Sequence, residues 1–162
     1  MEKIYISKSA YDTTRLGGEF AKKLQGGDVI ALYGDLGSGK TTFVQGLARG
    51  LGVKQRIISP TFVIIRQYKA SPPRCNAFYH IDLYRIDSER AIKGLGLEEI
   101  ISDPQNIVAI EWAEKMGNML PKKRIDIYFE YVDEHKRRIT RFARRRRGSP
   151  RATARRAIKK SN

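Results

Sequence analysis

The sequence predicts an α/β protein: a mostly parallel, mixed sheet flanked by helices, with antiparallel hairpins added to it. Two observations support this prediction. In the first half of the chain, segments with strand patterning alternate with segments of helical spacing, the order that builds a parallel sheet. Within that order, residues 28–34 (DVIALYG) contain an uninterrupted apolar run, which is typical of a strand in the middle of such a sheet.

The first half of the chain supplies two strands and two helices. Residues 3–7 (KIYIS) predict a short strand. Ser9, with Asp12 three residues later, is a variant of the capping box and begins a helix that runs to about Leu24. A glycine pair ends this helix. After the buried strand, residues 39–52 predict a second helix that is closed by a C-terminal glycine.

The second half predicts two antiparallel hairpins. A strand from Phe62 onward, after a Ser-Pro loop, and a returning strand at 77–82 flank the turn SPPRCN. The segments RIDIYFEY and RRITRF alternate in polarity and are joined by VDEHK, so they predict the second hairpin. Between the hairpins we expect two short helices at 88–93 and 97–101, a buried strand at 106–112 and a helix that stops before Pro121.

The net charge of +15 is unevenly distributed along the 162 residues. From Lys136 onward there are 13 Lys or Arg residues and no acidic one, which leaves 19 basic and 17 acidic side chains in the first 135 residues. We therefore divide the chain into a domain, residues 1–142, whose first 135 residues are nearly neutral, and a basic tail, residues 143–162. The tail is arginine-rich and of low complexity, and we expect it to be disordered.

Cysteine usage and hydropathy predict a cytoplasmic protein with no membrane partner. Cys75 is the only cysteine, which excludes an internal disulfide and fits a reducing compartment. No apolar run is long enough to span a bilayer, and the first residues lack the basic and apolar regions of a secretory signal.

A glycine-rich motif connects the buried strand to the second helix. Gly34-x-x-x-x-Gly39-Lys40-Thr41 matches the P-loop pattern at every fixed position. Glycines let main-chain N–H groups turn inward around a phosphate, the helix N-terminus adds donors, the lysine adds charge and the threonine hydroxyl can ligate Mg²⁺. A chance glycine-rich turn is the alternative, but it leaves the strand-to-helix setting unexplained. The motif predicts nucleotide binding and a three-layer P-loop NTPase fold.

Two carboxylates follow predicted strands and are candidates for the metal shell that a P-loop enzyme needs. Asp82 ends the strand AFYHID, and Glu111 ends the strand IVAIE. Ligands bind at the carboxyl ends of strands in open α/β sheets, so both acids can face the P-loop. The alternative is a solvated carboxylate at a loop entrance. Thr61, in SPTF, is either a switch-type hydroxyl near the γ-phosphate or part of an ordinary Ser-Pro turn. His80 is expected to be a packed or capped histidine.

Four blocks of sequence resemble the TsaE (YjeE) family of small bacterial P-loop ATPases: YGDLGSGKTTFVQG, SPTF, HIDLYR, and IEWAEK followed by LP. The resemblance covers about residues 4–142. It implies an ATPase that supports the formation of threonylcarbamoyladenosine at position 37 of tRNAs, together with the TsaB–TsaD pair, in which TsaD is the transferase. ATP would be the substrate and Mg²⁺ the cofactor.

The resemblance also implies roles for individual residues. Lys40, Thr61, Asp82 and Glu111 would be catalytic, with Asp82 near the metal shell or the attacking water and Thr61 in a mobile, switch-like loop. Thr41 and Glu111 would ligate Mg²⁺. The implied ATP-binding residues are Gly34, Leu36, Gly37, Ser38, Gly39, Lys40, Thr41, Thr42 and Trp112.

The basic tail is not part of the family's pattern, so the resemblance says nothing about it. Its charge suits a phosphate backbone, and one interpretation is that it grips tRNA or an acidic face of the partner proteins. The other is a solvated extension that aids solubility or binds RNA without specificity. Phe142 is the only aromatic residue from Lys136 onward, so the sequence does not support base stacking there.

Two further functions stand beside the ATPase. A small-molecule or nucleotide kinase uses the same P-loop, although no extra segment between Gly94 and Asn106 is large enough for a substrate lid. A nucleotide-dependent binding module without useful hydrolysis is the third possibility. The core blocks contain no evident arginine finger, and Arg85 is more simply structural. An ATPase of this kind is therefore expected to hydrolyse ATP slowly unless a partner completes its site.

Overall fold

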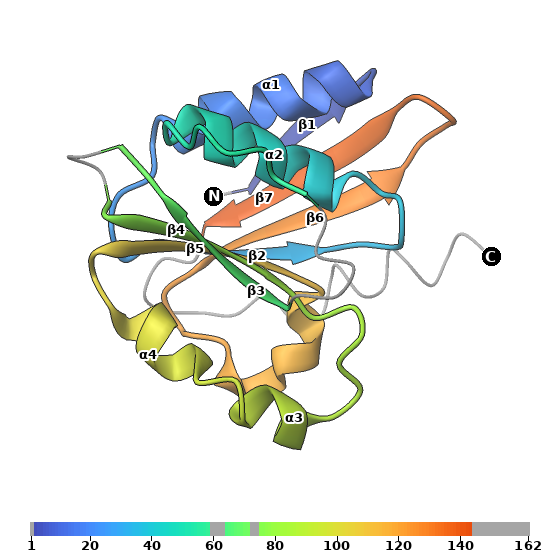
Figure 1. Ribbon diagram of the computed structural model, residues 1–162. Coiled ribbons are helices and arrows are strands. Elements are labelled where there is room, and N and C mark those ends of the chain that lie inside the picture. The colour runs from blue at the N-terminus through green and yellow to red at the C-terminus, as the bar shows by residue number, and fades with distance from the viewer. Residues whose placement is uncertain (1, 59–63, 72–74, 144–162) are drawn as a thin grey trace.

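The computed structural model describes residues 2–58, 64–71 and 75–143. Within them, a seven-stranded sheet has the order β1-β7-β6-β2-β5-β4-β3 and carries helices on both faces (Figure 1). None of these described helices is long and apolar enough to cross a lipid bilayer. The strands are β1 (Glu2–Ser7), β2 (Val29–Tyr33), β3 (Ile65–Lys69), β4 (Ala77–Asp82), β5 (Asn106–Glu111), β6 (Ile125–Tyr131) and β7 (Arg137–Ala143). The helices are α1 (Ala10–Ala21), α2 (Lys40–Gly50), α3 (Glu89–Lys93), α4 (Leu97–Ser102) and the 3-10 helix η1 (Ala113–Met119).

The middle of the sheet is parallel and its margins are antiparallel. The four central strands, β6, β2, β5 and β4, run parallel to one another. The outer strands β3 and β7 run antiparallel to β4 and β6, respectively. The α/β class and both predicted hairpins are therefore confirmed, with β3 beginning at Ile65; Phe62, where the strand was predicted to begin, lies outside the described residues. β1 adds an antiparallel pairing that the sequence did not predict, because its partner, β7, lies at the far end of the chain.

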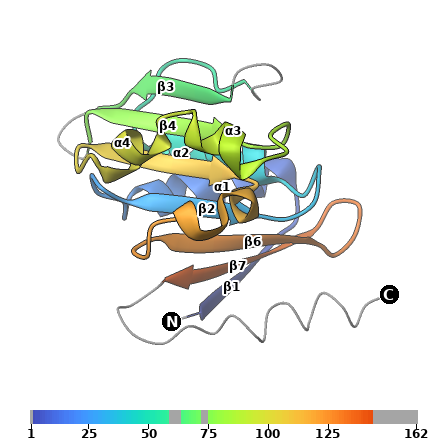
Figure 2. The ribbon, with the colours of Figure 1, turned by 90° about the horizontal axis from the view of Figure 1, so that it is seen from below.

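Helices form a layer on each side of the sheet (Figures 1 and 2). Side chains alternate between the two faces of each strand, so β2, β3, β4 and β5 contribute to two separate apolar clusters, one on each face. On the face covered by α1 and α2, Leu32 packs with Phe43 and Phe129. On the face covered by α3, α4 and η1, Ile110 packs with Met116. The predicted three-layer architecture results from this division.

Helices α1 and α2 touch each other through glycines. A Cβ atom on Gly17 would collide with the carbonyl oxygen of Phe43, and one on Gly46 would collide with that of Thr14. The two helix backbones therefore lie in direct contact, with no space for a side chain at these positions. This contact fixes the position of α2, and with it the loop that enters α2 from β2.

Two predicted helices differ in detail from the observed ones. α1 begins as predicted, because the Ser9 hydroxyl accepts a hydrogen bond from the Asp12 amide. It ends at Ala21, and Leu24 reaches the core from the turn that follows. The predicted helix before Pro121 is present as a 3-10 helix, and its path is interrupted at Gly117, which has a positive φ of 51°.

Candidate nucleotide-binding site

The loop between β2 and α2 has a backbone that requires glycine. Gly34 and Gly37 have φ values of 139° and 74°, in the region that other residues rarely adopt. A Cβ on Gly34 would lie 2.5 Å from the carbonyl oxygen of Phe129, and one on Gly37 would lie 2.8 Å from the hydroxyl oxygen of Tyr131. The Tyr131 hydroxyl also donates to the Gly37 carbonyl over 2.9 Å. Strand β6 thus holds the loop from outside.

The N-terminus of α2 offers donors for an anion. Its cap residue, Gly39, supplies no side chain to accept from the first-turn amides. The neighbouring Ser38 hydroxyl is buried and has no hydrogen-bond partner in the described structure. A buried hydroxyl without a partner beside free helix-terminal amides fits a site built for a phosphate group.

Lys40 is buried at the first position of α2 and points back over the loop. Its ammonium donates to the carbonyl oxygens of Gly34 and Asp35 over 2.5 and 2.9 Å and lies 4.2 Å from the centre of the Trp112 ring. Burial lowers the pKa of Lys40, while nearby carboxylates, Glu111 foremost, oppose that change. Two carbonyls and a ring face give this cation less compensation than a phosphate would.

Thr41 and Glu111 meet next to the loop. The Thr41 hydroxyl lies 2.9 Å from both carboxylate oxygens of Glu111 and donates to them. On the other side, the Nε2 atom of His80 lies 2.8 Å from Oε1 of Glu111. Because an ionised carboxylate only accepts, Nε2 carries the proton in this pair. Glu111 is therefore fixed from two directions by residues on α2 and β4.

Asp82 lies on the same edge of the sheet as Glu111. The two residues are paired in the register of β4 and β5, and one Asp82 carboxylate oxygen accepts from the Tyr84 amide over 3.0 Å. Burial raises the pKa of Asp82, and the charge of Glu111 adds to this effect. The carboxyl ends of β2, β4 and β5 thus converge on one place, as the sequence predicted for the two acids.

A pocket of about 500 Å³ opens over these residues, within the usual range for small-ligand sites. Trp112 forms one wall, with its ring centre 5.1 Å from that of Tyr84. Among the described residues Trp112 is the only non-glycine with a positive φ, 58°, a strained conformation that is often found at functional positions. The lining consists of Leu36, Gly37, Gly39, Lys40, Thr41, Thr42, Ile64, Asp82, Tyr84, Arg85, Ile86, Glu111 and Trp112.

The oxygen atoms of Thr41 and Glu111 are of the kind that Mg²⁺ binds. The described residues contain no cluster of three or more His, Cys, Asp or Glu side chains that could hold a metal by themselves. Mg²⁺ bound with a nucleotide usually takes one or two protein oxygens and completes its shell with phosphate and water. Thr41 and Glu111, adjacent to the anion site, match that requirement.

The structure brings most of the predicted site residues together. Gly34 and Ser38 support the loop without lining the pocket, and Thr61 lies outside the described residues. His80 is packed, as expected, but its contact with Glu111 places it in the site as well. Strand alternation could have found it, since it puts His80 on the same face as Asp82. The apolar lining residues Ile64 and Ile86 gave no sequence signal of their own.

Comparison with known proteins yields one family and several close relatives. The sequence model of the family described as "Threonylcarbamoyl adenosine biosynthesis protein TsaE" matches residues 7–139. A Bacillus subtilis protein named tRNA threonylcarbamoyladenosine biosynthesis protein TsaE is 40% identical over 126 residues, covering 78% of this chain and 74% of the relative. A Nostoc protein of the same name is 41% identical over 147 residues, covering 88% and 87% of the two chains. The crystal structure of Bacillus subtilis YdiB superposes with a TM-score of 0.71 and 32% identity, covering 88% of this chain and 86% of that one.

Proposed function

The chain belongs to the TsaE family of threonylcarbamoyladenosine biosynthesis proteins, and from this membership we propose that it is a Mg²⁺-dependent ATPase that assists tRNA modification. Its proposed partners are the TsaB and TsaD proteins, with tRNA engaged indirectly. The reaction is hydrolysis of ATP to ADP and orthophosphate, slow in the isolated protein and faster once the partners are bound.

One observation carries this proposal. The anion site at residues 36–41, the buried Lys40 ammonium and the Thr41–Glu111 pair all border the same pocket. A nucleotide-independent scaffold has no use for a buried cation whose partners are two carbonyls and a ring. A triphosphate would replace the carbonyls as partners of Lys40 and supply the anion that Ser38 and the amides of α2 lack.

Each residue then has a defined task. Lys40 and the loop amides would hold the β- and γ-phosphates, and Trp112 would pack beside the nucleotide. Thr41 and Glu111 would hold Mg²⁺, which would supply positive charge beside the phosphates. His80 donates to Glu111 and so orients that carboxylate. Asp82 would accept a hydrogen bond from the attacking water. No described residue other than Arg85 brings a guanidinium to the pocket lining, which is consistent with slow intrinsic hydrolysis.

Nucleotide binding and product analysis test the chemistry. Calorimetry with ATP and Mg²⁺ should detect binding to the full chain, and Lys40→Ala should abolish it or weaken it by at least about 100-fold. Lys93→Ala, an exposed lysine of α3, is the matched control and should bind like the wild type. Orthophosphate without a phosphorylated acceptor is the expected product, whereas a phosphorylated nucleoside or nucleotide would favour the kinase. Glu111→Ala should stop turnover, and a fully active Glu111→Ala protein would contradict the site.

Reconstitution tests the role in tRNA modification. With TsaB, TsaD and unmodified tRNA, the wild-type chain should support many rounds of threonylcarbamoyladenosine formation per complex. Lys40→Ala should reduce this to about a single round or less, because the proposed task of hydrolysis is to allow repeated turnover. Full multiple-turnover modification with Lys40→Ala would refute the proposed role even if the chain hydrolyses ATP.

A further inference from the structure

Strand β1 leaves one side of its backbone without a partner strand. It is the terminal strand of the sheet and pairs only with β7 among the described residues. Figure 2 shows it at the margin of the sheet, on the side where α3, α4 and η1 do not reach. Free N–H and C=O groups along such an edge are a template for another strand.

The side chains of β1 add apolar surface to this edge. Ile4 and Ile6 are 57% and 51% exposed, and Ile58 is the one other exposed isoleucine among the described residues. They lie on one face of the strand, and Glu2 precedes them on the same face. Lys8, which is exposed, continues the alternation directly after the strand. That face therefore reads Glu, Ile, Ile, Lys.

We propose that β1 pairs with β1 of a second copy of this chain, antiparallel and around a two-fold axis at Tyr5. In that register Glu2 faces Lys8 of the second copy, and Ile4 faces its Ile6. Each of these pairings occurs twice because of the symmetry. Opposite charges and β-branched side chains placed directly across from each other are the pairs that stabilise antiparallel strands.

Neighbouring registers fit less well. A shift of two residues in one direction places Glu2 opposite Ile6, and a shift in the other direction places Ile4 opposite Lys8. Each removes both ion pairs and sets a charge against an apolar side chain. A lysine on an edge strand often prevents pairing with another strand. In the proposed register, however, Lys3 lies opposite Ser7 of the second copy and not opposite another cation. The pattern is thus self-complementary in one register.

The other edge of the sheet lacks these properties. β3 carries Arg66, Gln67 and Lys69 among its five residues, and its isoleucine, Ile65, is partly buried. The proposed dimer is expected to be weak and concentration-dependent, because a single pair of short strands is at the small end of protein interfaces. The nucleotide site lies at the carboxyl ends of β2, β5 and β4, and β7 and β6 separate these strands from β1, so nucleotide binding should not depend on the dimer.

Charge reversal at the two ends of β1 tests the register. The full chain, freed of RNA by nuclease treatment, is examined by sedimentation velocity over a range of concentrations. Glu2→Lys places Lys opposite Lys in the homodimer, and Lys8→Glu places Glu opposite Glu. Each variant should dimerise at least about ten-fold more weakly than the wild type. An equimolar mixture of the two variants should recover dimerisation, because the mixed pair again sets Lys opposite Glu at both ends.

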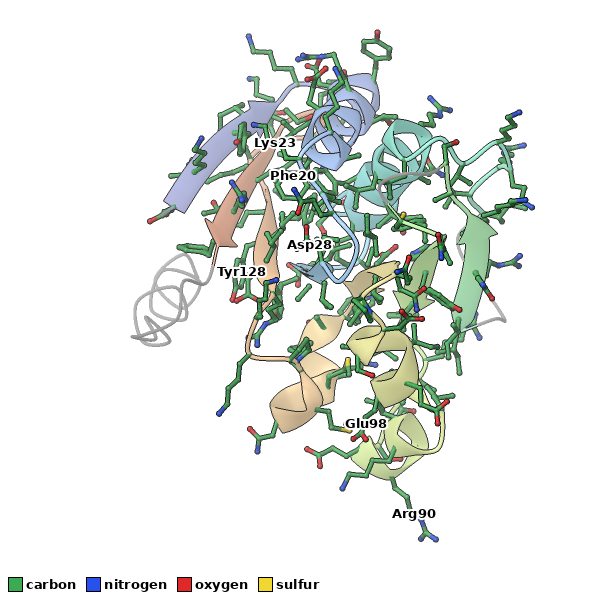
Figure 3. All side chains as sticks on the ribbon, turned by 90° about the vertical axis from the view of Figure 1, so that its left-hand side faces the viewer. Phe20, Lys23, Asp28, Arg90, Glu98 and Tyr128 are labelled. Carbon is green, nitrogen blue, oxygen red and sulfur yellow. The ribbon has the colours of Figure 1, made fainter. Side chains whose placement is uncertain are left out.

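Controls separate this effect from a change in net charge. Glu98→Lys on α4, which lies far from β1 (Figure 3), and Lys69→Glu at the end of β3 make the same charge changes elsewhere. Both should dimerise like the wild type, and all four variants should retain the wild-type circular dichroism spectrum and ATP affinity.

Three outcomes would overturn the proposal. The first is a wild-type chain that stays monomeric at every concentration. The second is dimerisation that the variants leave unchanged, or that their mixture does not recover. The third is dimerisation that appears only after residues 144–162 are deleted, which would mean that this segment and not a second copy occupies the edge in the full chain.

Discussion

The surroundings of Asp82 oppose the charge of its carboxylate. The carboxyl is half-buried beside Glu111, and burial raises its pKa above the usual aspartate value. In the unfolded chain the pKa is ordinary. The folded state therefore binds a proton more readily than the unfolded state, and the stability linked to Asp82 is lost as the pH rises through its folded pKa. At neutral pH the raised pKa of Asp82 therefore lowers the free energy of unfolding.

Asp82→Asn should for this reason stabilise the protein while impairing its reaction. We expect a higher melting temperature than that of the wild type at pH 7, with the difference shrinking as the pH falls through the raised pKa of the folded carboxyl. ATP hydrolysis should fall by about 100-fold or more if Asp82 assists the attacking water. Thermal denaturation across pH measures the first effect, with exposed Asp87→Asn as the control. A variant that is less stable than wild type at pH 7 would contradict this account.

At the scale of elements, the contact between α1 and α2 is made by backbone and not by side chains. Gly17 lies against the carbonyl of Phe43, whereas its neighbour, Gly18, has ordinary space around it, with the Gly46 carbonyl oxygen 3.7 Å from a Cβ. Of these two adjacent glycines, therefore, Gly17 has no space for a side chain and Gly18 has space for a methyl group. Because α2 begins at the P-loop, any displacement of the helix pair also moves the amides that face the pocket.

Gly17→Ala and Gly18→Ala form a matched pair that measures this contact. Gly17→Ala should lower the free energy of unfolding by about 2 kcal/mol, because the helices must separate to admit the methyl group. Gly18→Ala should raise it by about 0.5–1 kcal/mol, because alanine favours the helix and meets no obstacle. Urea denaturation of both variants tests the prediction. Equal effects of the two changes would show that the helices are not in close contact at Gly17.

The elements with local signals were predictable from the sequence. The P-loop from Gly34 to Thr41 has a fixed pattern, and the hairpin β3–β4 is bounded by a turn of prolines. Pairings between distant segments were not predictable, since nothing in KIYIS indicates a partner at residues 137–142. The same holds within the site. His80 lies on the face of Asp82 by alternation, but its contact with Glu111 depends on β5 being the neighbour of β4.

At the scale of the whole molecule, charge is separated along the chain. The first 135 residues, which include every pocket residue, carry 19 basic and 17 acidic side chains, and most of the excess charge lies from Lys136 onward. A nucleotide site formed by loop amides and one lysine does not require a cationic surface. Nucleotide binding and any RNA binding should therefore depend on different parts of the chain.

Removing residues 144–162 leaves β7 intact and tests whether nucleotide binding and RNA binding depend on different parts of the chain. ATP affinity and melting temperature should match those of the full chain. If the basic tail contacts RNA, tRNA affinity should fall and its dependence on salt should become shallower, because fewer phosphates are neutralised. Filter binding over a salt series measures both quantities. An unchanged affinity with an unchanged salt slope would exclude a role for the tail in RNA binding.

Trp112 is the only tryptophan in the chain, and its ring lies beneath the Lys40 ammonium at the wall of the pocket. Indole fluorescence responds strongly to a cation at this distance and to the polarity around the ring. The protein therefore carries its own optical reporter at the site of interest. A ligand that draws the ammonium away from the ring will alter the emission, so stopped-flow mixing can time its arrival and departure without any attached dye.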